Sequence, residues 1–213
     1  MKFVWISEFF LSASLALRMK RLEGAEVHPF VKAKGYEKIL EGILDKEDNY
    51  EKFKGEGNIF ITADDAMSGK LADELRKSGE LVYGGNAISD DLENKRSFGQ
   101  KVLNDYGLNV VESGNYKGAG AYDKALEFVK RKKGRWCFKQ NGDEDKSYNY
   151  SGKFENGDDM VDHILDMKKV WTENIDFDLQ AFVPGHECAI EGFFNGKDFL
   201  RDKEGEDFFI VNW

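Results

Sequence analysis

The sequence predicts an α/β protein in two parts, a small doubly wound domain over residues 1–90 and an α+β unit over residues 91–213. In the first part, short apolar runs alternate with helical patterns, which is typical of parallel strands covered by helices. In the second part, helical patterns give way to strand patterns separated by turn signals such as Pro184-Gly185 and Asn195-Gly196. Apolar residues make up 41% of the chain, so both parts have material for a packed core.

The first part is expected to contain four strands and three helices. The strands are the apolar runs Lys2–Ile6, Ala25–Val31, Asn58–Thr62 and Leu81–Tyr83. The helices are apolar stripes at helical spacing over residues 11–22, 36–44 and 71–75. The first helix ends at Gly24 and the last at Ser78-Gly79. The turn Gly84-Gly85 then leads to a domain boundary between residues 86 and 91.

The second part begins with helices and ends with strands. Helices are expected over Leu92–Tyr106 and Tyr122–Lys132 and after the capping residues Asp158 and Asp159. Strands are expected over Leu108–Val111, Arg135–Lys139, Phe177–Val183, Glu187–Phe194, Asp198–Arg201 and Asp207–Asn212, the last four as an antiparallel meander. The final run, Phe208–Trp213, is apolar enough for a central strand, so we expect this sequence to be a fragment or a truncated relative of a longer protein.

Charge and cysteine usage narrow the class of protein. The formal net charge of −9 repels a phosphate backbone, which argues against a nucleic-acid partner. Cys137 and Cys188 lie far apart without C-x-x-C spacing, so neither a disulfide framework nor a zinc site is expected. No signal peptide and no run of the length needed to span a membrane is found. A soluble protein in the reducing cytoplasm is therefore predicted.

The sequence lacks the motifs of nucleophilic catalysis, of a metal cluster and of a phosphate-binding loop. No G-x-S-x-G turn is present, and neither cysteine has a histidine near it in sequence. His28, His163 and His186 are scattered, so no metal cluster is visible. The first strand runs into Ser7–Leu11 without a glycine, which leaves no phosphate loop or dinucleotide fingerprint and makes a dehydrogenase a remote alternative.

Four segments in a fixed order carry a family resemblance. They are the helix start Leu92–Lys101 with Tyr106–Val111 behind it, the strand Trp136–Lys139, the segment Gln180–Glu187 and the strand Cys188–Gly196. In this order they resemble the ATP-grasp family. Within it, residues 61–79 and 81–84 are similar to the segments that precede the grasp domain of phosphoribosylamine-glycine ligases. The resemblance implies a partial ATP-grasp (α+β) domain after residue 90, with ATP and Mg²⁺ as cofactors.

The resemblance also assigns roles to seven residues. Lys95 and Lys139 would bracket the triphosphate, since a lysine ammonium is a flexible point charge that suits phosphate oxygens. A one-residue ambiguity leaves Arg96 as the alternative to Lys95. The nucleotide base would lie against the hinge formed by Gln180, Ala181, Phe182 and Val183, with the backbone of Ala181 and Val183 facing the adenine edge and Phe182 as apolar cover. Glu187 would bind the ribose hydroxyls.

Four features depart from the family pattern. Gln180 replaces the usual glutamate. The loop over residues 141–152 carries Asp143, Glu144 and Asp145 where the family has a glycine-rich phosphate flap, and these carboxylates repel a triphosphate. The ligands for Mg²⁺ would lie beyond Trp213. The turn Ile6–Leu11 is a poor phosphate cradle, which argues against a purine-pathway substrate.

The predicted function is ATP-dependent ligation of a carboxylate to an amine through an acyl phosphate. This chain by itself is expected to bind nucleotide without turnover, and its last apolar strand is expected to favour self-association. The alternative is a nucleotide-binding or interaction module that has lost catalysis. The acid and the amine are not readable from the sequence.

Overall fold

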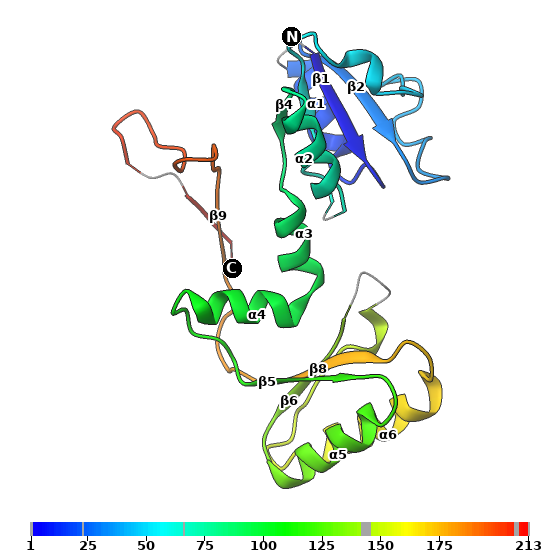
Figure 1. The fold of residues 1–213 in the computed structure, drawn as a ribbon, viewed down its shortest axis with the longest axis vertical. Helices are drawn as coiled ribbons and strands as arrows, with labels where there is room; N and C mark the ends of the chain where they lie inside the picture. Colours follow the sequence, from blue (N-terminus) through cyan, green and yellow to red (C-terminus); the bar gives the residue numbers. More distant parts are fainter. Residues whose placement is uncertain (1, 23, 66, 142–145, 207–208, 213) are drawn as a thin grey trace.

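The computed structural model describes residues 2–22, 24–65, 67–141, 146–206 and 209–212. It forms two separate sheets, joined by two helices, and a short hairpin (Figure 1). The first part holds β1 Lys2–Ser7, α1 Ala13–Leu22, β2 Glu26–Val31, the 3₁₀ turn Glu51–Phe53, β3 Ile59–Ile61, α2 Gly69–Lys77 and β4 Leu81–Tyr83. Helices α3 Ala87–Asn94 and α4 Arg96–Asp105 follow. The second part holds β5 Ser113–Lys117, α5 Ala121–Arg131, β6 Trp136–Gln140, the 3₁₀ turn Lys146–Tyr148, β7 Tyr150–Ser151, α6 Asp158–Val170, β8 Asp176–Ala181, β9 Ala189–Gly192 and β10 Phe209–Asn212.

The first sheet is entirely parallel, with the strand order β2-β1-β3-β4. Because side chains alternate along a strand, β1 sends Val4 and Ile6 to one face and Trp5 to the other, and all three are buried. Val4 and Ile6 join a core with Phe60, while Trp5 joins a second core with Phe10. A parallel sheet buried on both faces confirms the predicted doubly wound domain.

The helix predicted over residues 36–44 is wrong. The segment forms successive turns, in which the amides of Ile39 and Ile43 donate to the carbonyl oxygens of Tyr36 and Leu40, three residues back. Leu40 and Gly42 adopt φ angles of 59° and 76°, which a right-handed helix cannot include. Ile39, Leu40 and Leu44 still pack on the core, so the apolar spacing reflected burial rather than a helix.

The two parts are joined by α3 and α4, which replace the single helix predicted over Leu92–Tyr106. Helix α3 begins at Asn86, whose side chain accepts a hydrogen bond from the Ser89 amide at 2.9 Å. The helical conformation is interrupted at Lys95, whose backbone angles are φ −114° and ψ 83°. The division placed at residue 90 falls inside α3.

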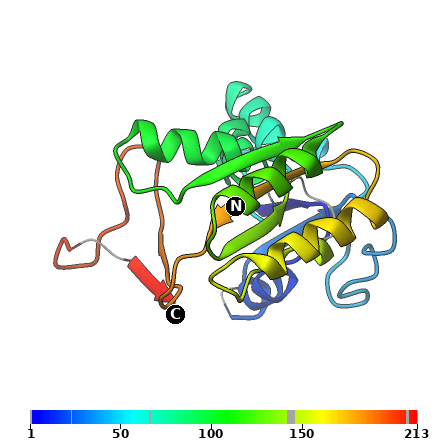
Figure 2. The ribbon, with the colours of Figure 1, turned by 90° about the horizontal axis from the view of Figure 1, so that it is seen from below.

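The second sheet is antiparallel, with the order β5-β8-β6-β7, and α5 and α6 cover one of its faces (Figure 2). Phe138, Phe177 and Leu179 form the core beneath the helices, and each has no exposed side chain surface. The rings of Phe138 and Phe177 stack with centroids 4.3 Å apart. This sheet with its two helices matches the predicted α+β unit.

The strand predicted over Leu108–Val111 is wrong, and the pairing strand β5 lies further along the chain. Leu108 and Val110 are 56% and 36% exposed. The ring of Tyr116 in β5 stacks on the ring of Phe177 with centroids 5.4 Å apart. This contact with the core determines where along the chain the strand forms. Alternation of apolar residues alone did not reveal this.

The predicted meander is also wrong beyond β8. Both edges of β8 are already paired, with β5 on one side and β6 on the other, so β9 cannot join it. Strand β9 pairs with β10 instead, and residues 198–201 form no named strand but include the isolated bridge between Phe194 and Phe199. Ile210 and Val211 are 40% and 49% exposed, against the expectation of a central strand.

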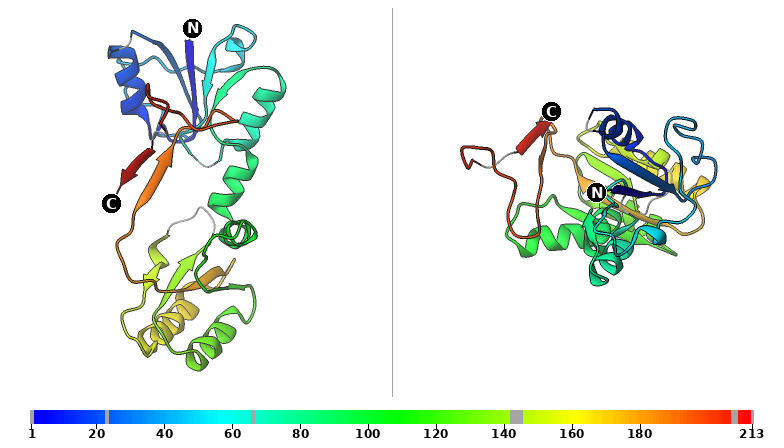
Figure 3. Two further views of the ribbon diagram at one scale, coloured as in Figure 1. Left: turned by 90° about the vertical axis from the view of Figure 1, so that its left-hand side faces the viewer. Right: turned by 90° about the horizontal axis from the view of Figure 1, so that it is seen from above.

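The β9–β10 hairpin lies apart from both sheets, at the side of the first domain (Figure 3). The rings of Tyr83 at the end of β4 and Phe193 are 6.4 Å apart. None of the helices in the described part of the chain has the length and apolar character needed to cross a membrane.

Candidate functional site

One face of the second sheet is free of the packed helices and carries polar side chains. Opposite residues of paired strands share a face, and the register pairs Lys139 with Asp178 and Cys137 with Gln180. Their neighbours Phe138 and Leu179 point to the opposite, helix-covered face. We call the face with Lys139 and Gln180 the open face. Helix α4 lies on this side of the sheet (Figure 1).

Asp178 is the most deeply buried charged group on the open face, with 2% of its surface exposed. Its Oδ1 atom accepts hydrogen bonds from the side-chain amides of Asn115 at 2.8 Å and Asn141 at 3.3 Å. The Nε atom of Arg96 lies 3.9 Å from its Oδ2 atom. A buried carboxylate needs such partners, because an unpaired charge in this position is costly.

Asp176, two residues before Asp178, has its own set of partners. Burial acts to raise the pKa of this carboxyl, but hydrogen bonds from Lys117, Asn141 and Asn115 outweigh burial and leave the pKa below its ordinary value. Asp176 is therefore a stable anion that anchors the edge of the open face.

In α4 and directly after β6, three buried polar atoms have no hydrogen-bond partner among the described residues. They are Nε of Arg96, Oε1 of Gln100 and Oδ1 of Asn141. Arg96 and Gln100 lie one turn apart on α4, and Asn141 directly follows β6. Buried polar groups in native proteins are nearly always paired, so these atoms mark a place where a polar ligand or water completes the structure.

The two candidates for the first phosphate contact differ in their surroundings. Lys95 lies between α3 and α4 with its side chain 62% exposed, and its Nζ atom pairs with Asp91 at 2.7 Å. Arg96 instead points to the open face and approaches Asp178. The geometry therefore places Arg96, rather than Lys95, on the open face.

Lys139 is half-buried in the centre of the open face. Its ammonium forms no ion pair with any residue that the structure describes. A lysine in this position can bind an anionic group without first breaking an ion pair to a described residue. The acidic residues Asp143, Glu144 and Asp145 lie outside the described residues.

In the hinge segment, residues 180–183, two backbone amides already donate hydrogen bonds within the protein. The amide of Ala181 donates to the Glu112 carbonyl at 2.8 Å, so it is not free for an adenine edge. The amide of Phe182 donates to the Arg135 carbonyl at 2.9 Å, and the Arg135 guanidinium lies 3.5 Å from the Phe182 ring centre. Gln180 is 9% exposed and Val183 is 65% exposed.

Glu187 lies away from these contacts. It is exposed, in the extended segment between β8 and β9. The turn predicted at Pro184-Gly185 does not fold β9 back onto β8, so Glu187 is not brought against the sheet.

Sequence reasoning missed Asp178, Asn115 and Asn141. One signal was present, because Asp176, Asp178 and Gln180 alternate with Phe177 and Leu179, which is the pattern of a strand with one polar face. The asparagines carry no such signal. Asn115 meets Asp178 across 63 positions of the chain.

A magnesium site does not fit the described residues. No group of three or more His, Cys, Asp or Glu side chains that could hold a metal ion is found among them. Asp178, the buried carboxylate of the open face, has its contacts with Asn115, Asn141 and Arg96.

No sequence family and no curated protein matches the chain. Among solved structures, D-alanine-D-alanine ligase from Helicobacter pylori is similar, with a TM-score of 0.60 and 13% identity over 98% of this chain and 74% of that one. Phosphoribosylamine-glycine ligase from Thermotoga maritima has a TM-score of 0.61 and 12% identity over 94% of this chain and 48% of its own. The chain has the fold of the ATP-grasp ligases.

A third similar structure carries a nucleotide. It is N5-carboxyaminoimidazole synthetase from Staphylococcus aureus complexed with ADP, with a TM-score of 0.54 and 12% identity over 89% of this chain and 49% of that one. The chain therefore spans about half the length of two of these three ATP-grasp structures and three quarters of the other.

Proposed function

We propose that this protein is an ATP-dependent carboxylate–amine ligase of the ATP-grasp type. The open face of the second sheet supports the proposal, because Lys139 of β6 and the Nε atom of Arg96 at the start of α4 both face it without a hydrogen bond to a described residue. A structural neighbour with ADP bound supports a nucleotide ligand for this fold.

We assign the nucleotide contacts as follows. Lys139 and Arg96 bind phosphate oxygens, because their ammonium and guanidinium groups face the open face without an established hydrogen bond to a described residue. Lys95 joins them only if it leaves Asp91. Gln180 and the backbone of Val183 meet the adenine edge with Phe182 as cover, and Glu187 accepts hydrogen bonds from the ribose hydroxyls.

The proposed reaction has two steps. A substrate carboxylate oxygen attacks the terminal phosphorus of ATP, which gives an acyl phosphate and ADP. An amine nitrogen then attacks the acyl carbon, the amide bond forms, and inorganic phosphate and a proton leave. Positioning and charge neutralisation do most of the work in phosphoryl transfer, so the role of Lys139 and Arg96 is to hold the phosphates and offset their charge.

We also propose a cytoplasmic location and self-association. Cys137 and Cys188 are both free, which suits a reducing compartment. The β9–β10 hairpin exposes Ile190, Phe209 and Ile210, and the outer edges of its strands, which pair with no other strand among the described residues, can pair with a second chain.

A nucleotide-binding module without catalysis is the second candidate. Gln180 favours it, because a glutamine stands where the family has a glutamate and this weakens a polar contact to adenine without abolishing it. Such a module would bind ATP and leave it intact.

A phosphate-release assay separates the two functions. The purified chain is incubated with ATP, Mg²⁺ and a panel of paired amines and carboxylates, with Lys139→Ala as the site control. Release that needs both organic substrates and is lost in Lys139→Ala supports the ligase. Nucleotide binding without release for any pair supports the module, and failure to bind nucleotide contradicts both functions.

A further inference from the structure

Arg135 and Phe182 form a pair of side chains on the open face. Arg135 directly precedes β6, and Phe182 directly follows β8. The amide of Phe182 donates to the Arg135 carbonyl at 2.9 Å, which extends the antiparallel pairing of the two strands by one residue. Opposite residues of paired strands share a face, and side chains alternate along each strand. The pair lies two positions beyond Cys137 and Gln180, so it belongs to the same open face.

The guanidinium of Arg135 covers one face of the Phe182 ring. Its central carbon lies 3.5 Å from the ring centre, a distance that the hydrogen atoms of the ring forbid to any group approaching in the ring plane. Arginine suits such a contact, because its guanidinium is planar and only weakly hydrated. Phe182 is half-buried, so part of its ring remains accessible to a ligand.

A hydrogen bond to Gly152 holds the guanidinium in this position. The Nε atom of Arg135 donates to the Gly152 carbonyl at 3.0 Å. The amide of Gly152 in turn donates to the Trp136 carbonyl at 2.8 Å, so the backbone of Gly152 runs close against β6. A Cβ atom at this glycine would lie 2.7 Å from the Trp136 carbonyl oxygen, which is closer than Cβ atoms approach in proteins. A glycine is therefore needed here to bring its carbonyl up to Arg135.

No ion pair competes for this guanidinium in the part of the chain that the structure describes. Its side-chain contacts there are the hydrogen bond to Gly152 and the stack on Phe182. Arg96, the other arginine of the open face, instead approaches the carboxylate of Asp178. The contacts of Arg135 therefore serve to fix the place of one aromatic ring.

The distance between this pair and Lys139 suits the two ends of a nucleotide. Arg135 and Lys139 are four residues apart on one extended stretch, which at ~3.3 Å per residue separates their Cα atoms by about 13 Å. Cys137 and Gln180 lie between them on the same face. A nucleoside triphosphate has a flat base at one end and its terminal phosphate at the other. A base on Phe182 and phosphates at Lys139 are therefore compatible with one bound molecule.

We propose that Arg135 is a positioning residue, which holds the Phe182 ring in the orientation that stacks on the nucleotide base. The inference rests on the proposed function, in which Phe182 covers the adenine. A phenylalanine in the segment after β8 loses side-chain freedom when a base stacks on it. Because the guanidinium already restricts the ring, less of that freedom is lost on binding, and the affinity for the base increases.

Calorimetric titration of the intact chain with ATP and UTP tests the proposal in Arg135→Lys, which keeps the positive charge and removes the planar guanidinium. ATP should bind about threefold to tenfold more weakly than to the wild type. The preference for ATP over UTP should shrink, because the two nucleotides share ribose and triphosphate and differ in the area of the base. The matched control is Arg131→Lys, at an exposed arginine that ends α5, and it should bind both nucleotides as the wild type does.

A second substitution shows whether Arg135 acts through Phe182. Phe182→Leu removes the ring and keeps an apolar side chain, so it should reduce the preference for ATP over UTP as Arg135→Lys does. In the Phe182→Leu background, Arg135→Lys should cause no further loss of ATP affinity, because the ring it positions is already absent. An equal loss in both backgrounds would show that Arg135 acts independently of the ring and overturns the proposal.

The failure of this inference is distinguishable from the failure of the proposed function. If Arg135→Lys keeps the wild-type preference for ATP, in a chain that binds ATP and releases phosphate with its paired substrates, the positioning role is overturned and the ligase proposal stands. If the wild-type chain binds no ATP, the proposed function is overturned, and with it the base contact of Phe182.

Discussion

Arg96 connects the two features of the open face that bear on nucleotide binding. Its Nε atom faces Asp178 at 3.9 Å but has no hydrogen bond to a described residue. A phosphate that arrives on this face therefore competes with Asp178 for the guanidinium, and the cost of leaving Asp178 less well paired limits the affinity. Lys139 has no such competitor among the described residues, so we expect it to contribute more.

Glu187 is predicted to act on the ribose, although it lies apart from the sheet in this structure. Removal of the 2′ hydroxyl from ATP should weaken binding to the wild-type chain by about tenfold, the cost of a hydrogen bond to a carboxylate. The same change should have little effect in Glu187→Ala, because the partner is already absent. Competition binding with ATP and 2′-deoxyATP measures both losses.

Glu155→Ala is the control for this cycle, since Glu155 is an exposed glutamate of the second part. It should behave as the wild type does. Equal losses for 2′-deoxyATP in wild type and Glu187→Ala would mean that Glu187 does not touch the ribose.

Some site residues could be predicted from the sequence and others could not. Lys139 ends a clear apolar strand, and its position on the open face follows from alternation. Lys95 and Arg96 are adjacent, and only the break between α3 and α4 decides which one faces the sheet. Asn141 belongs to the site because its side-chain amide donates a hydrogen bond to Asp178, which lies 37 residues later. No local sequence pattern reveals a contact over that separation.

Among the elements, parallel strands were the easiest to predict. β1 and β3 are buried on both faces, so they appear as continuous apolar runs with turn residues around them. The antiparallel strand β5 has the sequence Ser-Gly-Asn-Tyr-Lys, with one aromatic side chain directed to the core. A single apolar residue does not form the alternating pattern by which a strand is predicted. Pairing partners were also hidden, because β8 lies between β5 and β6, two strands that come before it in the chain.

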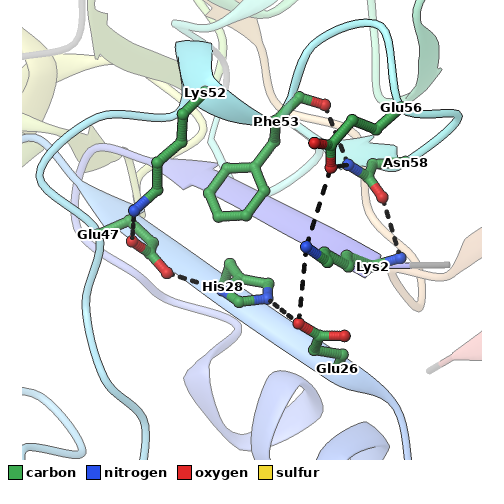
Figure 4. A network of polar contacts seen from close by, with 8 residues as sticks. All are labelled: Lys2, Glu26, His28, Glu47, Lys52, Phe53, Glu56 and Asn58. Atoms are coloured by element: carbon green, nitrogen blue, oxygen red, sulfur yellow. Dashed lines mark hydrogen bonds and ion pairs between the residues drawn. The ribbon is translucent and has the colours of Figure 1, made fainter.

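A polar network ties β2 to the connection before β3 (Figure 4). His28 contacts Glu47 at 2.7 Å through Nδ1 and Glu26 at 2.9 Å through Nε2. Lys52 pairs with Glu47 at 2.6 Å, and the Phe53 ring lies 4.6 Å from the imidazole. The turn over Glu51–Phe53 is thereby fixed against the sheet edge.

This network predicts how the stability of the first domain depends on pH. The hydrogen bond from His28 is the main cause that lowers the pKa of Glu26. For Glu47, burial acts to raise the pKa, but hydrogen bonds from Lys52 and His28 outweigh it and the pKa is lowered. A carboxyl with a lowered pKa stabilises the folded state above its ordinary value of 4.5, and the contribution is lost as the pH falls through the lowered pKa.

Glu47→Gln should therefore make the free energy of unfolding fall less steeply as the pH is reduced below about 4.5. Urea unfolding at a series of acidic pH values measures this slope. Glu37→Gln, at an exposed position without an ion pair to a described residue, should leave the slope unchanged. An unchanged slope in Glu47→Gln would show that the network does not contribute to acid stability.

At the scale of the whole molecule, the two parts have separate hydrophobic cores. The core of the second part contains Phe138 and Phe177, whereas Phe60 belongs to the first domain. Phe138→Ala should destabilise the second part by about 3 to 5 kcal/mol, the usual cost of removing a buried phenylalanine. Because no core residue is shared, we expect the first domain to keep its stability.

Hydrogen exchange resolves the two parts by peptide. In Phe138→Ala, amides of β6 and β8 should lose protection while those of β1 and β3 retain it. Phe60→Ala, the matched change in the first domain, should give the opposite pattern. Equal loss of protection in both parts of either variant would contradict two independent units.

Calorimetric titration of Lys139→Ala with ATP tests whether the open face of the second sheet binds ATP. Loss of a hydrogen bond between a lysine and a phosphate should weaken binding by about tenfold to a hundredfold. Lys133→Ala, which removes an exposed lysine before β6, should bind as the wild type does. ATP affinity that is the same in Lys139→Ala as in the wild type, in a chain shown to bind ATP, would contradict the account.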